Sequence, residues 1–115
     1  ASVGRLPTLR VLSLSLNKFT GSIPTELGKL RSLLHLRLDN NKITGSVPTE
    51  LGRLASLLTL DLSFNQLSGS LPAELVFLSA LTVLNCRRNH LSGAFPRNAY
   101  RMTSLARVDA SLNPW

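Results

Sequence analysis

Residues 30–53 read LRSLLHLRLDNNKITGSVPTELGR, and residues 54–77 read LASLLTLDLSFNQLSGSLPAELVF, so two successive stretches of 24 residues share most of their apolar, glycine, proline and asparagine positions. The same spacing extends in both directions, to units at 6–29 and 78–101 and a partial unit at 102–115. A fixed period of this size indicates stacked structural units. We therefore interpret residues 1–115 as a single repeat array.

Each unit contains a short alternation of apolar and polar residues. Leu36-Arg37-Leu38 and Leu60-Asp61-Leu62 have the period of two that is typical of a strand with one buried face. One such strand cannot bury its leucines alone, but parallel neighbours ~4.8 Å apart form a sheet with a shared core. The pattern predicts one strand per unit in a continuous parallel sheet.

The segment after each strand carries an asparagine, then a glycine and a proline. An amide side chain both donates and accepts hydrogen bonds, so we expect a structural ladder of asparagines that satisfies backbone groups of the turns. Each proline is expected to open a short helical or 3₁₀ segment, such as residues 25–30. The ladder consists of Asn17, Asn41, Asn65, Asn89 and Asn113.

The full phrase Leu-x-x-Leu-x-x-Leu-x-Leu-x-x-Asn-x-Ile/Leu-x-Gly-x-Ile/Val/Leu-Pro, present from Leu30 to Pro48 and from Leu54 to Pro72, resembles the plant-specific class of leucine-rich repeats. That class includes receptor-like kinase ectodomains and polygalacturonase-inhibiting proteins. The resemblance implies an α/β leucine-rich repeat solenoid. This is a right-handed curved superhelix with a parallel β-sheet on its concave face, short helical or 3₁₀ segments on its convex face, and a second short strand per repeat. It also implies an extracellular or cell-surface location, with an intracellular assembly as the alternative.

The ends of the array and its single cysteine bear on how the chain is used. No recognisable polar cap stands at either end, so we expect a fragment of a longer protein that lacks both caps, or partners that cover the ends. Cys86 occupies a column that holds leucine in the first three units, and it is interpreted as a small buried hydrophobe.

The charge of the chain is strongly basic. Thirteen lysines and arginines against six acidic residues give a net charge of +7. A basic patch would attract an acidic protein surface or a glycan, although a merely solvated surface explains the same composition. Nucleic acid is disfavoured because aromatic residues are few, and the sequence has no apolar run of ~18 residues for membrane insertion. The basic residues are concentrated towards the C-terminal end, at Arg87, Arg88, Arg97, Arg101 and Arg107.

The exposed columns of the strands vary between units while the core columns do not, and a varied surface on a rigid frame suits binding. Within this surface, Phe64 is interpreted either as an interface anchor beside Arg88 or as packing at the margin of the sheet. Arg37 and Asp61 are lateral neighbours, and an ion pair between them is favoured over a ligand site. The candidate partner-binding residues are His35, Arg37, Asp39, Asp61, Phe64, Asn85, Arg87, Arg88 and Arg107.

These observations favour a non-catalytic protein. The sequence shows no nucleophile beside a base and no glycine loop that would hold phosphate, and His35 and His90 lie two units apart in different columns. We therefore predict no catalytic residue, no metal and no cofactor.

The leading hypothesis is a module that binds a protein or peptide on the concave strand surface. The alternative is a structural subunit held in a larger assembly through its uncapped ends and basic C-terminal face. Binding to an ice or polysaccharide surface is a third hypothesis, and the irregular columns argue against ice, because its lattice calls for a repeated side chain.

Overall fold

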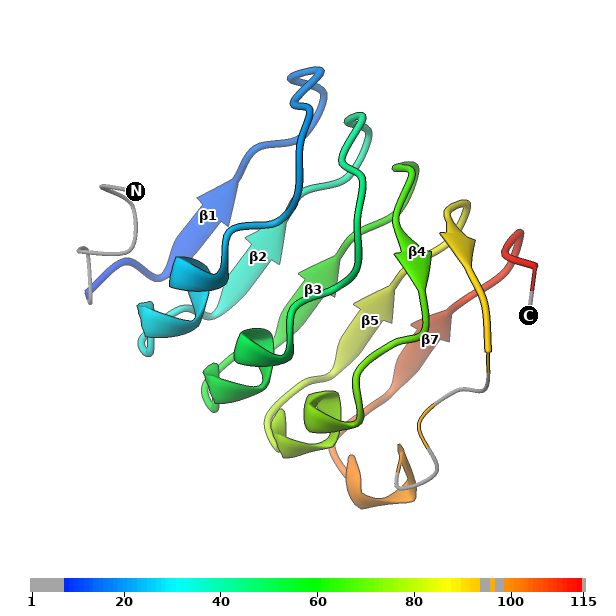
Figure 1. Ribbon diagram of the computed structural model, residues 1–115. Helices are drawn as coiled ribbons and strands as arrows, with labels where there is room; N and C mark the ends of the chain where they lie inside the picture. The colour runs from blue at the N-terminus through cyan, green and yellow to red at the C-terminus, as the bar shows by residue number, and fades with distance from the viewer. Residues whose placement is uncertain (1–7, 94–95, 97–98, 115) are drawn as a thin grey trace.

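The computed structural model describes residues 8–93, 96 and 99–114, so Arg97 of the predicted basic patch and the first seven residues of the predicted array lie outside the described part. Five strands of three residues form one parallel sheet, with neighbours in chain order (Figure 1). The strands are β1 (Val11–Ser13), β2 (His35–Arg37), β3 (Thr59–Asp61), β5 (Val83–Asn85) and β7 (Arg107–Asp109).

The register of this sheet repeats the period of the sequence. Leu12 pairs with Leu36, Leu36 with Leu60, and Leu60 with Leu84. Each strand residue therefore lies beside the residue 24 positions further along the chain. One face of the sheet therefore carries a row of apolar residues that is buried at its centre, at Leu36, Leu60 and Leu84, and the other face carries the varied columns. The predicted leucine-rich repeat solenoid is confirmed.

The opposite layer consists of 3₁₀ helices that stack along the array: η2 (Thr25–Lys29), η3 (Thr49–Arg53), η4 (Ala73–Phe77) and the shorter η5 (Ala99–Arg101) (Figure 1). Pro24 directly precedes η2 with φ −65°, a value that its ring already imposes. Close stacking of η2 on η3 needs a glycine, because a Cβ on Gly28 would lie 2.5 Å from the carbonyl oxygen of Glu50.

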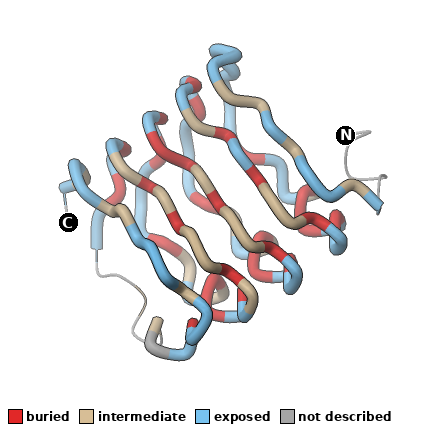
Figure 2. The backbone as a smooth tube through the Cα atoms, turned by 180° about the vertical axis from the view of Figure 1, so that it is seen from behind, coloured by how far each residue is buried: buried red, intermediate tan, exposed pale blue. Residues whose placement is uncertain are grey.

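The hydrophobic core lies between these two layers. Its central leucines, including Leu36, Leu60 and Leu62, have no exposed surface. Figure 2 shows buried and intermediate residues alternating along the central strands, whereas the outermost strands are more exposed. At the outer strands the core is open: Leu12 is only half-buried and Val108 is 47% exposed.

The second strand per repeat is present in only part of the described chain. β4 (Ser68–Gly69) and β6 (His90–Leu91) form a two-stranded parallel sheet. In the first two units the corresponding segments keep two ladder bonds, from the Lys42 N–H to the Phe19 carbonyl (2.8 Å) and from the Thr44 N–H to the Gly21 carbonyl (2.8 Å), but they form no regular strand.

The recurring asparagines connect successive repeats. The Asn65 side-chain NH2 group donates to the carbonyls of Leu38 (2.9 Å), Leu62 (3.1 Å) and Ser63 (3.2 Å), and its oxygen accepts from the Ile43 N–H (3.2 Å). One buried amide therefore satisfies backbone groups of its own turn and of the preceding repeat. The same arrangement recurs at Asn41, Asn89 and Asn113.

Candidate binding surface

The sheet face opposite the core places the polar columns side by side. In one column His35 pairs in register with Thr59, and in the next Arg37 pairs with Asp61. The residues that follow each strand continue these columns. All nine candidate binding residues therefore lie on the strands of this face or within three residues after them: His35, Arg37, Asp39, Asp61, Phe64, Asn85, Arg87, Arg88 and Arg107.

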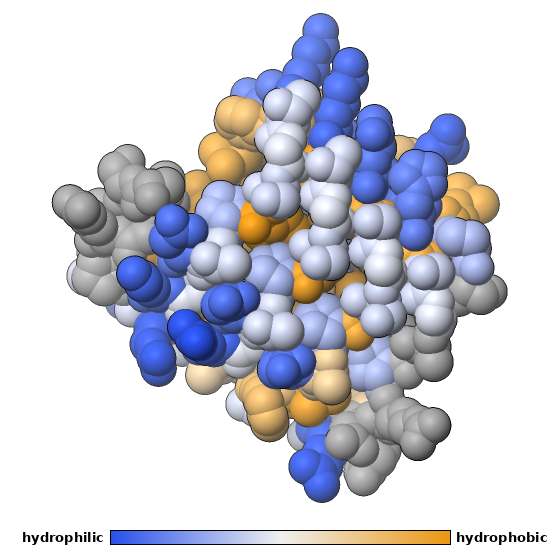
Figure 3. All heavy atoms as spheres, viewed as in Figure 1, coloured by the Kyte–Doolittle hydropathy of each residue, from blue (hydrophilic) through white to orange (hydrophobic). Residues whose placement is uncertain are grey.

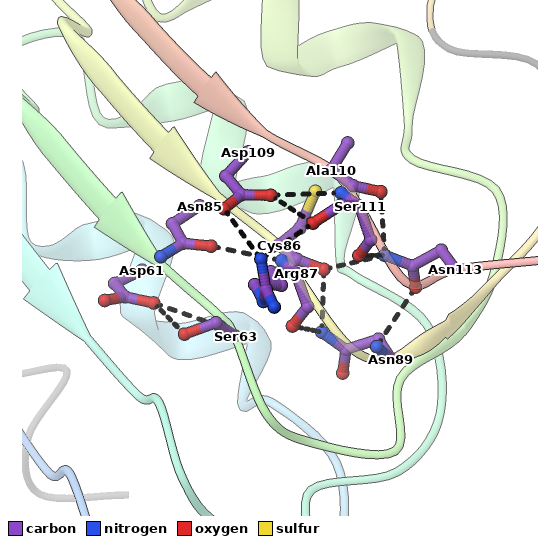
Figure 4. A network of polar contacts seen from close by, with 10 residues as sticks. All are labelled: Asp61, Ser63, Asn85, Cys86, Arg87, Asn89, Asp109, Ala110, Ser111 and Asn113. Atoms are coloured by element: carbon purple, nitrogen blue, oxygen red, sulfur yellow. Dashed lines mark hydrogen bonds and ion pairs between the residues drawn. The ribbon is translucent and has the colours of Figure 1, made fainter.

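Carboxylates at the ends of two strands are used for turns. An Asp61 oxygen accepts from the Ser63 N–H (3.0 Å) and the Ser63 hydroxyl (2.6 Å). Asp109 does the same with Ser111, at 3.1 Å and 2.6 Å (Figure 4). At Asn85, the amide oxygen accepts from the Arg87 N–H (3.1 Å) in the same position of its repeat. These side chains fix the direction in which the chain leaves the sheet.

Asp39 makes a different contact. One of its oxygens accepts from the Ser15 hydroxyl of the preceding repeat (2.6 Å), and the other accepts from the Asn40 side chain (2.8 Å). The candidate carboxylates of this face are therefore already engaged within the protein, which leaves the cations as its available charged groups.

Arg87 joins the last two repeats. Its guanidinium lies 3.8 Å from an Asp109 oxygen and 3.3 Å from the Ser111 hydroxyl oxygen (Figure 4). The hydrogen bonds from Ser111, followed by the charges of Arg87 and Arg107, lower the pKa of Asp109 below its ordinary value of 3.8. This pair is a surface ion pair, because both side chains are more than two-fifths exposed.

The predicted ion pair between Arg37 and Asp61 is wrong. The two residues are register neighbours, yet within the described residues no ion pair joins them, because the Asp61 carboxylate turns to Ser63. Glu50 and Arg53, three residues apart in η3, form no ion pair in the described part of the chain either. Arg37 is exposed and keeps its charge towards solvent.

Phe64 and Arg88 form a contact between adjacent repeats. The Arg88 guanidinium carbon lies 5.8 Å from the centroid of the Phe64 ring, within the range of a cation–π interaction. Phe64 is 39% exposed, so the ring is only partly covered by this contact and by its own turn. Both interpretations of Phe64 therefore stay predictions, and the structure shows a partly exposed ring beside an arginine.

Two other side chains stand out by their chemistry. His35 is half-buried, and its Nδ1 atom is buried without a hydrogen-bond partner. Cys86 is fully buried, as expected, and burial together with the charge of Asp109 raises the pKa of its thiol to about 11.

No cluster of three or more histidine, cysteine or acidic side chains that could hold a metal ion occurs among the described residues. No helix formed by them is long and apolar enough to cross a membrane.

Serines are the members of this surface that sequence reasoning missed. Ser63 and Ser111 direct the carboxylates of Asp61 and Asp109, and Ser15 holds Asp39. A signal was present, because the triplets at 61–63 and 109–111 both place serine two residues after aspartate at the same point of the repeat.

The other faces carry no candidate residue. Figure 3 shows the convex side, where hydrophobic atoms appear mainly in the hollows between rows of more polar side chains and at the margins. An apolar cavity of about 190 Å³ lies at the β1 end of the array, lined by residues of the first repeat such as Leu12, Leu14, Ile23 and the exposed Phe19.

Comparison with known proteins agrees with this geometry. A family model described as a leucine-rich repeat region matches residues 1–112. None of the curated proteins with which the sequence was compared matches it significantly.

Several solved structures resemble the chain closely. The ectodomain of the Arabidopsis thaliana receptor kinase GASSHO1/SCHENGEN3, in complex with CASPARIAN STRIP INTEGRITY FACTOR 2, is 40% identical over 95% of this chain, with a TM-score of 0.90. The plant peptide hormone receptor RGFR1, in complex with RGF2, is 35% identical over 96% of the chain, with a TM-score of 0.93. The ectodomain of the Arabidopsis thaliana receptor kinase SOBIR1 is 33% identical over 98%, with a TM-score of 0.90. The chain spans 13%, 18% and 62% of these three structures, respectively.

Proposed function

Because this chain belongs to the leucine-rich repeat family, we propose that it is a non-catalytic recognition module that binds a protein or peptide on the concave face of its five-stranded sheet. Two of the similar structures support this proposal, since each is a receptor that holds a protein or peptide partner. We further propose an extracellular or cell-surface location, in keeping with the receptor ectodomains that the chain resembles.

The observation that carries the proposal is that two arginines on this face have no acidic partner in the described part of the chain. Arg37 and Arg107 are exposed, and neither has a carboxylate within ion-pair distance in the described part of the chain. The aspartates beside them are held by serines or by Arg87. Two unpaired cations on a rigid sheet favour a partner with carboxylates or other acidic groups.

A displayed library of random peptides tests this proposal. Peptides selected on the chain should bind it saturably, and Arg37→Glu and Arg107→Glu should each weaken that binding by about tenfold or more. Arg53→Glu is the matched control, because it makes the same charge change on the convex helix η3 and should leave the affinity nearly unchanged. Equal losses from all three variants would show a non-specific charge effect. No loss from either concave variant would contradict the proposal.

A second candidate function, as a segment of a larger assembly, rests on the apolar cavity beside β1. An adjoining repeat of the same kind would cover Leu12, Leu14 and Phe19 just as interior repeats cover one another. In this case the chain should self-associate as its concentration rises, and light scattering should show the increase in mass. Phe19→Ser should reduce this association. A monomer at all concentrations would count against assembly between copies of the chain.

A further inference from the structure

One column of this fold combines strained backbone with bulky side chains. The residue three positions after each of the five main strands has a positive φ, between 56° and 59°. This left-handed region is rarely adopted by residues other than glycine, and asparagine tolerates it best. Only one of the five positions carries asparagine. We call this set the rim column: Leu16, Asn40, Phe64, Arg88 and Leu112.

Packing does not account for the bulky members of the rim column. Leu16 is 76% exposed, Leu112 is 56% exposed and Phe64 is 39% exposed. These side chains therefore add strain to the backbone and leave apolar surface in water, while the core gains little from them. Strained and exposed positions of this kind are typical of sites where a protein binds a partner.

The rim column has a regular geometry. The Leu16 N–H donates to the Asp39 carbonyl (3.2 Å), and the Phe64 N–H donates to the Arg87 carbonyl (2.8 Å), so the hydrogen-bonded ladder of the sheet continues through the column. Neighbouring members are therefore separated by about 4.8 Å, the spacing of adjacent strands. Apolar residues occupy every second repeat, which places Leu16, Phe64 and Leu112 about 9.6 Å apart in succession.

This spacing discriminates between partner conformations. A polyproline II helix rises about 3.1 Å per residue and has three residues per turn, so every third side chain recurs on one face at about 9.3 Å. An extended strand repeats the same face at about 6.8 Å, and an α-helix repeats it over seven residues at about 10.5 Å. The polyproline II repeat stays closest to the column over its whole length.

We propose that the rim column binds a peptide in the polyproline II conformation, with apolar side chains at positions i, i+3 and i+6 seated beside Leu16, Phe64 and Leu112. This inference rests on the proposed function and specifies the conformation and pattern of its peptide partner. Arg88 lies between two of the apolar contacts, with its guanidinium beside the Phe64 ring. A polyproline II backbone has no internal hydrogen bonds, so its carbonyls are available to the donors of Arg88.

The probe that tests this proposal is a nonapeptide of three Leu-Pro-Pro triplets. The control peptide has the same composition, with leucines at its first, third and fifth positions and prolines elsewhere, so that only the spacing of the apolar side chains changes. In amide NMR titrations of the full chain, the triplet peptide should bind about tenfold more tightly than the control. The shifted signals should lie at and beside the rim column.

Substitutions in the column give the proposal a distinctive signature. Leu16→Asn and Phe64→Asn should each weaken binding of the triplet peptide severalfold, yet each should leave the melting temperature unchanged or raised, because asparagine suits the left-handed backbone. Phe77→Ser is the matched control, since Phe77 is a similarly exposed apolar residue (63%) on helix η4, on the opposite side of the molecule. It should leave the affinity unchanged.

Three results would overturn the inference. The two peptides could bind equally, the shifts could be confined to the apolar cavity near Ile23, or Phe64→Asn could leave the affinity unaltered. If library-selected peptides still require Arg37 in any of these cases, the recognition function stands and only the rim column assignment fails. If no selected peptide depends on the concave arginines either, both proposals fail. Self-association of the chain that Leu16→Asn abolishes would also overturn the assignment, since a second copy would then be the occupant.

Discussion

At the scale of single residues, the repeated asparagine has the largest structural effect per side chain. Asn65 is 7% exposed and makes four hydrogen bonds to backbone groups that have been removed from water. Asn17 occupies the same column in the first described repeat, yet it is exposed, and among the described residues its amide donates only to the Ser15 carbonyl. One residue type in one column therefore has two very different environments.

Replacing each of these two asparagines with alanine should lower the free energy of unfolding by different amounts. Asn65→Ala leaves buried carbonyls and an N–H without partners, so the free energy of unfolding should fall by about 2–4 kcal/mol. Asn17→Ala should cost about 0.5 kcal/mol, because water can replace the lost contact. Urea denaturation of both variants measures the difference. Equal losses would mean that the ladder does not act through buried backbone groups.

Asp109 gives the protein a defined response to acid. Its pKa is lowered chiefly by the hydrogen bonds from Ser111, so the folded state favours the carboxylate. The stabilising contribution of Asp109 is therefore complete above its ordinary pKa of 3.8, and it is lost as the pH falls through the lower pKa of the folded protein. An NMR titration of the Asp109 carboxyl carbon should show this lowered pKa.

The same titration has a direct control. Ser111→Ala removes the hydroxyl that donates to Asp109 at 2.6 Å, and the pKa should move back towards 3.8. Ser79→Ala changes an exposed serine in a distant turn and should leave the Asp109 titration unaffected. A pKa at or above 3.8 in the unmodified protein would contradict this account.

At the scale of elements, the close stacking of the 3₁₀ helices depends on two glycines. A Cβ added to Gly52 would collide with the Glu74 carbonyl oxygen of η4, which is backbone and cannot move aside without shifting the helix. Val76 occupies the equivalent position in η4, where the next helix, η5, has only three residues. The last interface between helices therefore differs from the earlier ones.

Substitution of Gly52 should expose this packing constraint. Gly52→Ala should destabilise the protein by about 2 kcal/mol or more, because overpacking forces a backbone shift. Gly21→Ala is the comparison: nothing lies within 4 Å of its added Cβ, but its φ is +81°, so only the backbone cost of about 1 kcal/mol applies. Thermal melts of the two variants would rank them. A smaller loss at Gly52 than at Gly21 would show that the helices can separate freely.

Sequence patterns predict the elements of this chain better than they predict its surface contacts. The period of 24 residues places the strands and their register, because any slip would turn the buried leucines towards water. No pattern indicated the positive φ of Phe64 and Leu16, since bulky residues there oppose the usual preference for glycine or asparagine. The predicted Arg37 and Asp61 pair also failed, because being lateral neighbours is not enough when a serine two residues after the aspartate competes for its carboxylate. The spacing of Asp61 and Ser63 is the sequence signal for that competition.

At the scale of the whole molecule, stability should vary along the array, because each repeat contacts only its neighbours. The interior strands are covered on both sides, and Leu60 is fully buried between Leu36 and Leu84. Leu12 has a neighbouring strand on one side only within the described residues, and it lines the apolar cavity. The same methyl groups therefore contribute different amounts to stability at the two positions.

Two measurements test this gradient. Leu60→Ala should cost about 3–4 kcal/mol, as in a closed core, whereas Leu12→Ala should cost about half as much, because its cavity is already open to water. Native-state hydrogen exchange should protect the amides of β2, β3 and β5 more strongly than those of β1 and β7, since the outer repeats can open without breaking the central interfaces. Uniform protection across all five strands, together with equal losses from the two substitutions, would mean that the array unfolds as one block. The apolar edge beside β1 would then be covered as firmly as the centre of the array.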